Sequence, residues 1–456
     1  MTIYQLFIKG VFILIMIGNM ISLRGQPVIS IPEEQMRIDL EGSRVIKVEN
    51  GWDIDLRMAP DNNVHPELVF RRWWYCNIDN LNPDTGEILN IRITNAGYSD
   101  ITLPVWSLDG GPFERVPEIS LPQVSGSGPY THTFTLIPPP GVSTIRLAKY
   151  FPYNVEDKDR FIETIRGDSR TRVIVTGHSY ENRPIHRIDI TDYAVEDTFK
   201  RRVWIHAMVH PGETPPPYVI EGLVEFLLSS DPRAHILLEN FIFNIVPMVN
   251  PDGVAAGNYR VNTRITEKNP YGANLEEEWA EPWDSDEPEV AAIRKDIEKF
   301  MGSLEKPGSQ PIEILLNVHA AHLRKYPFHF LHEPAWSEPG DYGVNQAVHD
   351  LGLKWIDYFR QRSRFVSLGR TSKSTLGGEA RPYVEGMMFD RWSRHEKWTG
   401  PPNYQNPVMA ITYETTYAKG PDRKTWNTPD DYRQNGKKMA LAIGDFFNIW
   451  DCENNK

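Results

Sequence analysis

Hydrophobic and polar positions in the first third of the chain alternate in short runs. Between about residues 27 and 150 these runs are bounded by turn sequences such as Asp61-Asn62-Asn63 and Asp109-Gly110-Gly111. The spacing predicts strands at 44–48, 87–94, 131–137 and 144–148. Many short strands at this spacing are typical of a β-sandwich. We therefore expect a small all-β sandwich domain over residues 26–150.

After about residue 151 the pattern changes to apolar strands alternating with amphipathic helices. It predicts strands at 200–209, 241–249, 312–318 and 408–413. Helices are expected at 218–228, 290–300, 344–359 and 431–449, the first of them just after three prolines, which a helix start tolerates. Alternation of this kind indicates an α/β sheet covered by helices. Residues 151–456 are expected to form this second, catalytic-type domain.

The first 25 residues differ from both regions. Lys9 precedes an apolar run at 11–17, which is short for a membrane span and is interrupted afterwards by Gly18 and Asn19. A basic start followed by a short hydrophobic stretch is typical of a secretory signal peptide. We expect residues 1–25 to be such a signal, with the mature protein secreted or periplasmic. A short N-terminal anchor is the alternative, and no later stretch is predicted to cross a membrane.

Composition narrows the class of protein. A hydrophobic content of 40% and a charged content of 24% are those of an ordinary globular chain. The net charge of -12 argues against a nucleic-acid binder. Cys76 and Cys452 are isolated from each other and from any CxxC pattern, so a thiolate metal site is not expected.

The sharpest chemical signal is the sequence HPGE at 210–213, between a predicted strand and a predicted helix. A catalytic zinc takes three His or carboxylate ligands and keeps one position open for water. His210 and Glu213, three residues apart at such a turn, can point at one metal ion. The same spacing occurs by chance in many chains, and the turn is what favours a metal site here.

A third ligand must come from elsewhere in the chain. His319 follows the predicted strand 312–318, and the carboxyl ends of strands are where open α/β sheets collect ligands. We therefore expect His319 to complete the site, with His322 as the competing candidate.

Two further residues match what a hydrolytic zinc requires, namely a general base and a group that stabilises an oxyanion. Glu414 ends an apolar strand, where a carboxylate is costly without a purpose. Arg260 follows the strand 241–249 and the turn sequence NPDG at 250–253. Glu414 as base and Arg260 as oxyanion partner are the expected catalytic residues, with a structural ion pair as the alternative for Glu414.

These segments together resemble the M14 zinc carboxypeptidases, most closely their cytosolic-carboxypeptidase branch, in a bacterial secreted-type form. The resemblance rests on HPGE at 210–213, on PMVNPDGV at 247–254 and GNYR at 257–260, and on His319 and Glu414. It implies a mixed open sheet flanked by helices and preceded by a β-sandwich. It also implies one Zn²⁺ per chain and hydrolysis of a peptide or peptide-like substrate.

The chain departs from that family where the substrate's C-terminus should be held. The family has G-x-D-L-N-R-x-W, whose Asn and Arg bind the terminal carboxylate, whereas residues 272–279 read GANLEEEW. Glu276 and Glu277 thus replace the carboxylate clamp, and an anion does not hold an anion. We expect these two residues to contact substrate and to favour a basic, neutral or blocked end. A misalignment is the alternative, with Arg264, Arg324 or Arg381 as the clamp.

The family also uses a mobile tyrosine to touch the substrate amide. Tyr383, two residues after Arg381, is the candidate, with Tyr413 and Tyr417 as alternatives. Three hypotheses follow from the sequence. The first is a carboxypeptidase with altered C-terminal specificity, the second a zinc amidase or deacylase acting on modified or cell-wall peptides, and the third a non-catalytic binding protein on the same scaffold.

Overall fold

The structure is a computed structural model, and its contacts divide the chain into two compact units. It describes residues 26–30, 37–84, 86–280, 283, 285–303, 306, 308–321, 327–333, 344, 346–363, 371–374, 383–393, 408–417, 419–420 and 424–450. Each unit is described below by itself.

The first unit is all-β and contains two mixed or antiparallel sheets of five described strands each. One sheet has the order β1 (Val28–Ser30), β4 (Tyr75–Asp79), β10 (Ile145–Ala148), β6 (Val105–Leu108) and β7 (Glu114–Arg115). The other has the order β2 (Ile38–Val48), β3 (Gly51–Met58), β5 (Ile88–Ala96), β9 (Tyr130–Leu136) and β8 (Gln123–Ser125). In β5, buried and half-buried residues alternate, as expected where one face of a sheet packs inward. The predicted strands of this region are therefore confirmed to within a residue or two, except that β2 begins six residues early.

The division between the units does not follow a single boundary near residue 150. Segment Ala59–Trp73 lies between β3 and β4 in sequence, but its contacts group it with the second unit, which also includes Arg37 and the residues from Tyr150 on. The range 26–150 is thus interrupted in space. The turn sequence at 61–63, which the pattern assigns to the sandwich, belongs to the other unit.

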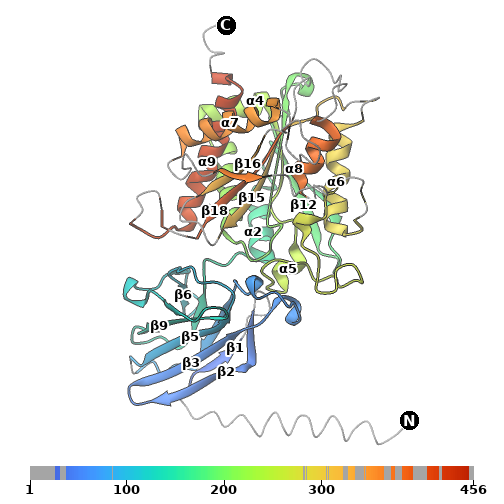
Figure 1. Cartoon of the computed structure of the whole chain (residues 1–456). Coiled ribbons are helices and arrows are strands. Elements are labelled where there is room, and N and C mark those ends of the chain that lie inside the picture. The colour runs from blue at the N-terminus through green and yellow to red at the C-terminus, as the bar shows by residue number, and fades with distance from the viewer. Residues whose placement is uncertain are drawn as a thin grey trace, which may run out of the picture. The chain divides into compact units, whose positions relative to one another are not determined.

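The second unit contains a mixed sheet in which eight strands are described (Figure 1). Their order is β11 (Thr171–His178), β12 (Pro184–Ile190), β14 (Phe241–Val246), β13 (Arg201–Ala207), β15 (Ile312–Ala321), β18 (Met409–Thr416), β16 (Phe328–His332) and β17 (Thr371–Ser374). β14, β13, β15 and β18 run parallel to one another. β12 pairs with β14 and β16 pairs with β18 in the antiparallel direction. The mixed α/β architecture predicted from the sequence is confirmed.

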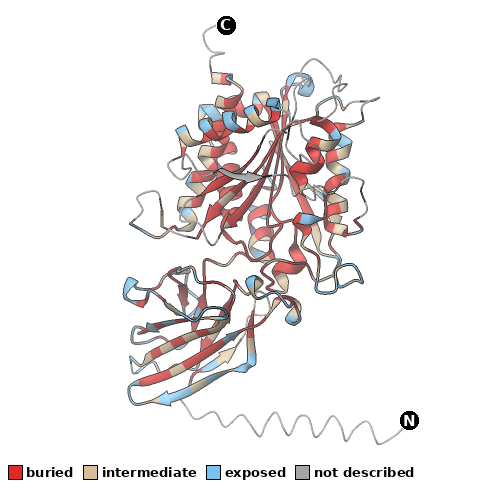
Figure 2. Ribbon diagram, viewed as in Figure 1, coloured by how far each residue is buried: buried red, intermediate tan, exposed pale blue. Residues whose placement is uncertain are grey.

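Helices cover both faces of this sheet. They are α2 (Val155–Ile165), α3 (Pro215–Leu227), α4 (Pro232–Asn240), α5 (Pro251–Ala255), α6 (Pro288–Met301), α7 (Gln346–Arg362), α8 (Val384–Met388) and α9 (Pro429–Phe446). Figure 1 shows α7 and α9 on one side of the central strands and α6 and α8 on the other. Figure 2 shows the central strands buried along their length, with exposed positions on the outer sides of the helices. All six residues of β14 are buried, which explains its continuous apolar sequence.

Local signals account for several helix ends. The side chain of Thr428 accepts a hydrogen bond from the backbone N–H of Asp431, and the Asp431 carboxylate accepts one from the backbone N–H of Thr428, which caps the start of α9. α3 begins with the three prolines of 215–217, whose missing N–H groups would have no partner in a first turn. Within the described residues no helix combines the length and apolar character that a membrane span requires. Cys76 is buried in β4, and burial raises the pKa of its thiol to about 12.

Candidate active site

The turn between β13 and α3 carries the first two candidate metal ligands. The Glu213 N–H donates to the His210 carbonyl oxygen at 3.2 Å, which closes the turn. Gly212 at its centre donates its N–H to the Tyr259 carbonyl oxygen at 3.1 Å. A side chain at this position would meet the Tyr259 Cα at 2.8 Å, so only glycine allows the two backbones to approach this closely. The turn is thereby fixed against the segment that carries Arg260.

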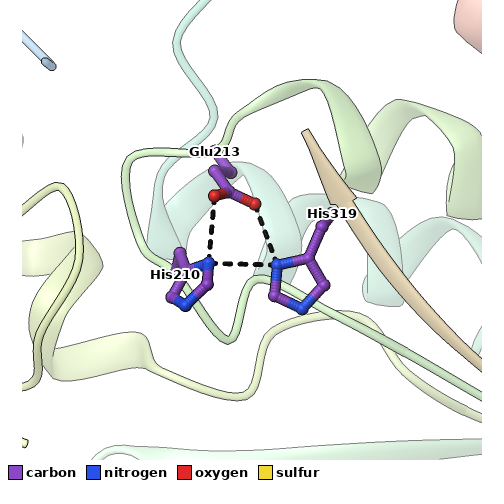
Figure 3. A group of neighbouring side chains, drawn as sticks. All are labelled: His210, Glu213 and His319. Carbon is purple, nitrogen blue, oxygen red and sulfur yellow. Dashed lines mark hydrogen bonds and ion pairs between the residues drawn. The ribbon is translucent and has the colours of Figure 1, made fainter. Parts of the chain in front are cut away.

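His319 joins this turn because β15 lies beside β13 and runs parallel to it. The His319 Nδ1 lies 3.0 Å from the His210 Nδ1 and 3.0 Å from the Glu213 Oε2, and the His210 Nδ1 lies 2.9 Å from the Glu213 Oε1 (Figure 3). One ligand atom from each of these residues lies within 4.8 Å of the others, and each residue is at most 3% exposed. The predicted grouping of His210, Glu213 and His319 is thus present. His322 lies outside the described residues.

Charge in this cluster fits a bound cation. Burial, followed by the charge of Arg260, lowers the pKa of His210 to about 4, so its imidazole is neutral. Burial opposes protonation of His319 as well, but the carboxylates of Glu276 and Glu213 outweigh it and hold the pKa of His319 well above its usual value. The cluster therefore attracts positive charge toward its centre. Two imidazoles and one carboxylate converging at such a point are the ligand set of a catalytic zinc site.

Arg260 lies beside this cluster. Its Nη1 is 3.3 Å from the His210 Nδ1, and its Nε is buried with no hydrogen-bond partner in the described part of the chain. The backbone N–H of Arg260 donates to the carboxylate of Asp61 at 2.7 Å, which fixes where the side chain starts. A guanidinium with a free donor at a metal centre suits an oxyanion partner.

Glu414 sits on β18 directly opposite His319 in the register of the parallel pair β15 and β18. Its Oε2 atom is buried without a hydrogen-bond partner among the residues that are described. Burial, and then the charge of Glu213, raises the pKa of Glu414 to about 8. A carboxylate that lacks a partner and binds a proton unusually well suits a general base.

Glu276 and Glu277, expected together at the substrate's end, occupy different environments within the 3₁₀ turn Leu275–Glu277. Glu276 is 7% exposed, and its carboxylate accepts hydrogen bonds from the Asn317 Nδ2 at 2.9 and 3.1 Å. Glu277 is exposed and accepts one from the Asn274 Nδ2 at 2.8 Å. Of this pair, only Glu277 is open to solvent.

The alternative clamp residues are placed as follows. The guanidinium of Arg264 forms ion pairs with Asp286 at 2.6 Å and with Glu287 at 3.2 Å, so it is already neutralised. Arg381 and Arg324 lie outside the described residues. Among the cations whose side chains are described, Arg260 is the one that contacts the metal cluster.

The three candidate tyrosines differ in the contacts of their hydroxyl groups and in their burial. The Tyr413 hydroxyl accepts a hydrogen bond from Asn435 at 2.6 Å in the core, and the Tyr417 hydroxyl donates to the Gly212 carbonyl at 3.0 Å. Both are therefore structural. Tyr383 is half-buried just before α8, and burial together with the charges of Glu277 and Glu276 raises its pKa. Tyr383 is thus influenced by the negative charges of Glu276 and Glu277, which lie on the 3₁₀ turn Leu275–Glu277.

Sequence patterns missed four residues of this site. The Asn274 Oδ1 lies 3.1 Å from the His210 Nε2, Asn317 binds Glu276, and Asp61 holds the backbone of Arg260. Glu385, 3% exposed, accepts a hydrogen bond from Thr412 beside Glu276, and its burial raises its pKa to about 7. Asn274 and Asn317 fall within motifs that were already singled out. Asp61 and Glu385 carry no local signal of their role.

The fold and this cluster define an α/β domain whose candidate metal centre is made of two histidines and a glutamate. Residues 160–343 match the family model Peptidase_M14, described as zinc carboxypeptidase. Over these residues the chain is therefore similar to the M14 zinc carboxypeptidases.

Similar proteins agree with this assignment. Cytosolic carboxypeptidase 2 of Danio rerio is 37% identical over 142 residues, which are 30% of this chain and 20% of that protein. Human cytosolic carboxypeptidase 6 is 26% identical over 282 residues, or 59% of this chain and 53% of that protein. This chain thus spans from about a fifth to about half of the length of these curated relatives.

Solved structures share the fold. A metallo-carboxypeptidase from Burkholderia cenocepacia superposes with a TM-score of 0.70 at 22% identity, covering 92% of this chain and 99% of that one. A metallo-carboxypeptidase from Pseudomonas aeruginosa gives a TM-score of 0.69 at 21% identity, with the same coverage of both chains. The likeness extends over both units of the chain, so the sandwich and the α/β sheet recur together in these proteins.

Proposed function

We propose that this protein is a zinc-dependent carboxypeptidase-type enzyme that hydrolyses a peptide amide bond. The observation that carries the proposal is the buried convergence of His210, Glu213 and His319, with Arg260 in contact with it and Glu414 opposite His319. A non-catalytic binding protein would have no need to keep the buried Glu414 Oε2 and Arg260 Nε beside such a centre, neither of which has a hydrogen-bond partner among the described residues.

The residues divide the reaction between them. When bound, zinc supplies a Lewis acid that polarises the carbonyl and makes water more acidic. The carboxylate of Glu414 takes the proton of the attacking water and returns it to the leaving amine. The guanidinium of Arg260 donates hydrogen bonds to the oxyanion that develops on the substrate. Glu213, His210 and His319 hold the metal with their ligand atoms facing one another.

Replacing Glu414 tests this mechanism. Glu414→Gln keeps the shape of the side chain but removes the base, so turnover of a peptide substrate should fall by roughly 100- to 10,000-fold. Zinc content, measured by elemental analysis, should stay at the level of the unaltered protein. Glu278→Gln, in the acidic turn but bound to Lys268 at 3.2 Å, is the matched control and should keep full activity. Retained activity in Glu414→Gln would remove Glu414 from the mechanism.

The specificity that we propose follows from position 277. Glu277 is exposed next to the metal cluster, and it feels the charge of Arg260 and raises the pKa of Tyr383. A carboxylate here repels a free C-terminal carboxylate and attracts an amino group. The enzyme should therefore prefer substrates whose end is basic, neutral or blocked.

A second candidate function is an amidase or deacylase that acts on modified or cell-wall peptides. The same exposed Glu277 favours it, because such substrates need no carboxylate clamp. Three matched peptides distinguish the two functions: one with a C-terminal lysine, its amidated form, and one with a C-terminal glutamate. Cleavage of the free lysine peptide over the amidated one supports the carboxypeptidase. Preference for the amidated peptide supports the amidase, and preference for the glutamate peptide contradicts both.

The variant Glu277→Arg sharpens this experiment. It places a cation where the family binds the terminal carboxylate, so it should raise kcat/KM for the glutamate peptide relative to the lysine peptide.

Arg381 and Tyr383 are the other residues that we propose to contact substrate. The variants Arg381→Ala and Tyr383→Phe test this role, and each should raise KM.

We also propose that residues 1–25 direct export, which would make the enzyme secreted or periplasmic. Lys9 and the apolar run at 11–17 support this. Amino-terminal sequencing of the mature protein from the periplasm or the medium tests it. Recovery only from the cytoplasm, with Met1 retained, would contradict export.

A further inference from the structure

The two histidines of the metal cluster differ in what holds the far side of each ring. Both present Nδ1 to the cluster and turn Nε2 outward. The His210 Nε2 forms a hydrogen bond with the amide oxygen of Asn274 at 3.1 Å, whereas the His319 Nε2 lies 3.3 Å from the Glu276 Oε2 in an ion-pair contact that lacks hydrogen-bond geometry. One imidazole thus has a neutral partner and the other a charged one.

Glu276 is itself held firmly in place. Its two oxygens accept from the same donor, the Asn317 Nδ2, at 2.9 and 3.1 Å. Asn317 is fully buried on β15 two residues before His319, and its Nδ2 also lies 3.2 Å from the Thr412 Oγ1 on β18. β15 therefore carries both His319, the third metal ligand, and Asn317, which binds Glu276. The carboxylate is fixed before any metal or substrate arrives.

We propose that Glu276 is a positioning residue for the zinc ligand His319 and does not contact substrate. The proposal rests on the proposed function in one respect, that the metal of this site is zinc. A carboxylate in ion-pair contact with Nε2 favours the tautomer that carries its proton on Nε2, so the lone pair of Nδ1 is left for the metal. It also orients the ring and makes Nδ1 a stronger ligand.

This role changes the interpretation of the two adjacent glutamates, Glu276 and Glu277. Position 276, which in the family faces the substrate's carboxylate, is turned inward here and serves the metal. Of the two adjacent glutamates, Glu277 alone remains open to the substrate. The replacement of both clamp residues by glutamate therefore has two separate consequences, tighter support of His319 and altered recognition of the substrate's end.

Zinc affinity, measured by competition with a chelator in the absence of substrate, tests the proposal. Glu276→Gln keeps the size of the side chain but removes the charge, and it should weaken zinc binding by about 10- to 100-fold. The visible spectrum of the cobalt-loaded protein should shift, since the His319 ring is no longer fixed. Glu278→Gln, whose carboxylate binds Lys268 at 3.2 Å instead of a ligand histidine, should leave both measurements unchanged.

Each outcome decides the question. Wild-type zinc affinity and an unshifted cobalt spectrum in Glu276→Gln would overturn the proposal, as would an equal loss in Glu278→Gln. Circular dichroism of the zinc-free variants checks that they are folded. If Glu276→Gln fails to fold, Glu276→Asp takes its place. Aspartate keeps the charge but draws it back from the ring, and its zinc affinity should fall measurably below wild type.

The measurement is independent of peptide hydrolysis. A wild-type protein that binds zinc and loses affinity in Glu276→Gln, yet cleaves no peptide, would contradict the proposed function and leave the role of Glu276 standing. An active enzyme whose zinc affinity ignores Glu276 would do the reverse.

Discussion

The buried carboxylate of Asp61 accepts the backbone N–H of Arg260 at 2.7 Å, although 198 residues separate the two in the chain. The same carboxylate accepts the N–H groups of Tyr259 and Val261 at 2.8 and 3.2 Å. Asp61 is fully buried, and segment Ala59–Trp73, on which it lies, groups with the α/β unit. Asp61 thus lies on a loop between two strands of the β-rich unit, and it fixes the backbone of Arg260, the proposed oxyanion partner.

Asp61→Asn should therefore damage catalysis more than metal binding. The amide offers one acceptor and a donor where three N–H groups converge, so the segment of Arg260 should shift, and kcat should fall by about 10- to 100-fold. The free energy of unfolding should drop by about 2 kcal/mol. Zinc content should not change. Steady-state kinetics and urea unfolding measure the two effects.

Asp109→Asn is the matched control for this substitution. Asp109 also accepts backbone N–H groups, from Ser143 at 3.0 Å and Thr144 at 2.9 Å, but it belongs to the β-rich unit. It should leave kcat unchanged. A kcat for Asp61→Asn equal to that of Asp109→Asn would show that the carboxylate of Asp61 has no part in placing Arg260.

Gly212→Ala tests the packing of the ligand turn. The added methyl would lie 2.7 Å from a Tyr259 ring carbon and 3.1 Å from the Trp73 Cβ, which forces the turn of His210 and Glu213 outward. We expect a loss of about 1–3 kcal/mol of unfolding free energy and weaker zinc binding. Gly167→Ala, where a methyl meets nothing within 4 Å, is the control. Normal zinc affinity in Gly212→Ala would contradict the tight contact.

The buried side chain of His329 should make the free energy of unfolding depend on pH. It is 1% exposed, accepts a hydrogen bond from the Trp355 indole at 3.2 Å, and burial lowers its pKa to about 3. An unfolded histidine titrates near 6.5, so between pH 6.5 and 3 the unfolded chain binds more protons than the folded one, and stability falls as pH falls. From pH 7 to pH 5 this group alone should remove about 2 kcal/mol.

Comparison with His329→Gln isolates that contribution, because glutamine does not titrate and the other groups cancel in the difference. Denaturant unfolding of both proteins at pH 7 and pH 5 measures it. The wild type should lose about 2 kcal/mol more than the variant over this interval. Equal losses would mean that His329 is not held neutral by burial.

The parts of the fold that sequence could predict are those with a local signal. The parallel strands β13, β14, β15 and β18 each contain a short cluster of buried apolar residues, and the sequence predicts each within a few residues of its observed bounds. β11 and β12 were missed because their apolar residues are sparse, and in β11 only Thr171 is buried. A partly exposed edge strand shows little of the pattern that reveals a buried one.

The same distinction holds in the site. His210, Glu213 and His319 were predictable because each follows the end of a strand that the sequence predicts, although β15 itself runs on to Ala321 and includes His319. Glu276 is expected to contact substrate because in residues 272–279 it stands where the family has the Asn of its carboxylate clamp. What separates them is the contact of Glu276 with Asn317, which depends on the packing of a turn against β15, 41 residues later. Asp61 was read as a sandwich turn for a similar reason, since its partners lie in a distant segment.

Titration of the metal-free protein with zinc tests the central claim most directly. Chelator-treated protein is supplied with increasing zinc while bound metal and peptide hydrolysis are followed together. The account predicts that activity rises in proportion to bound zinc and stops rising at one ion per chain. It also predicts that His319→Ala shows neither binding nor activity at the same concentrations. Activity that survives full removal of the metal, or a wild-type protein that binds no zinc, would contradict the account.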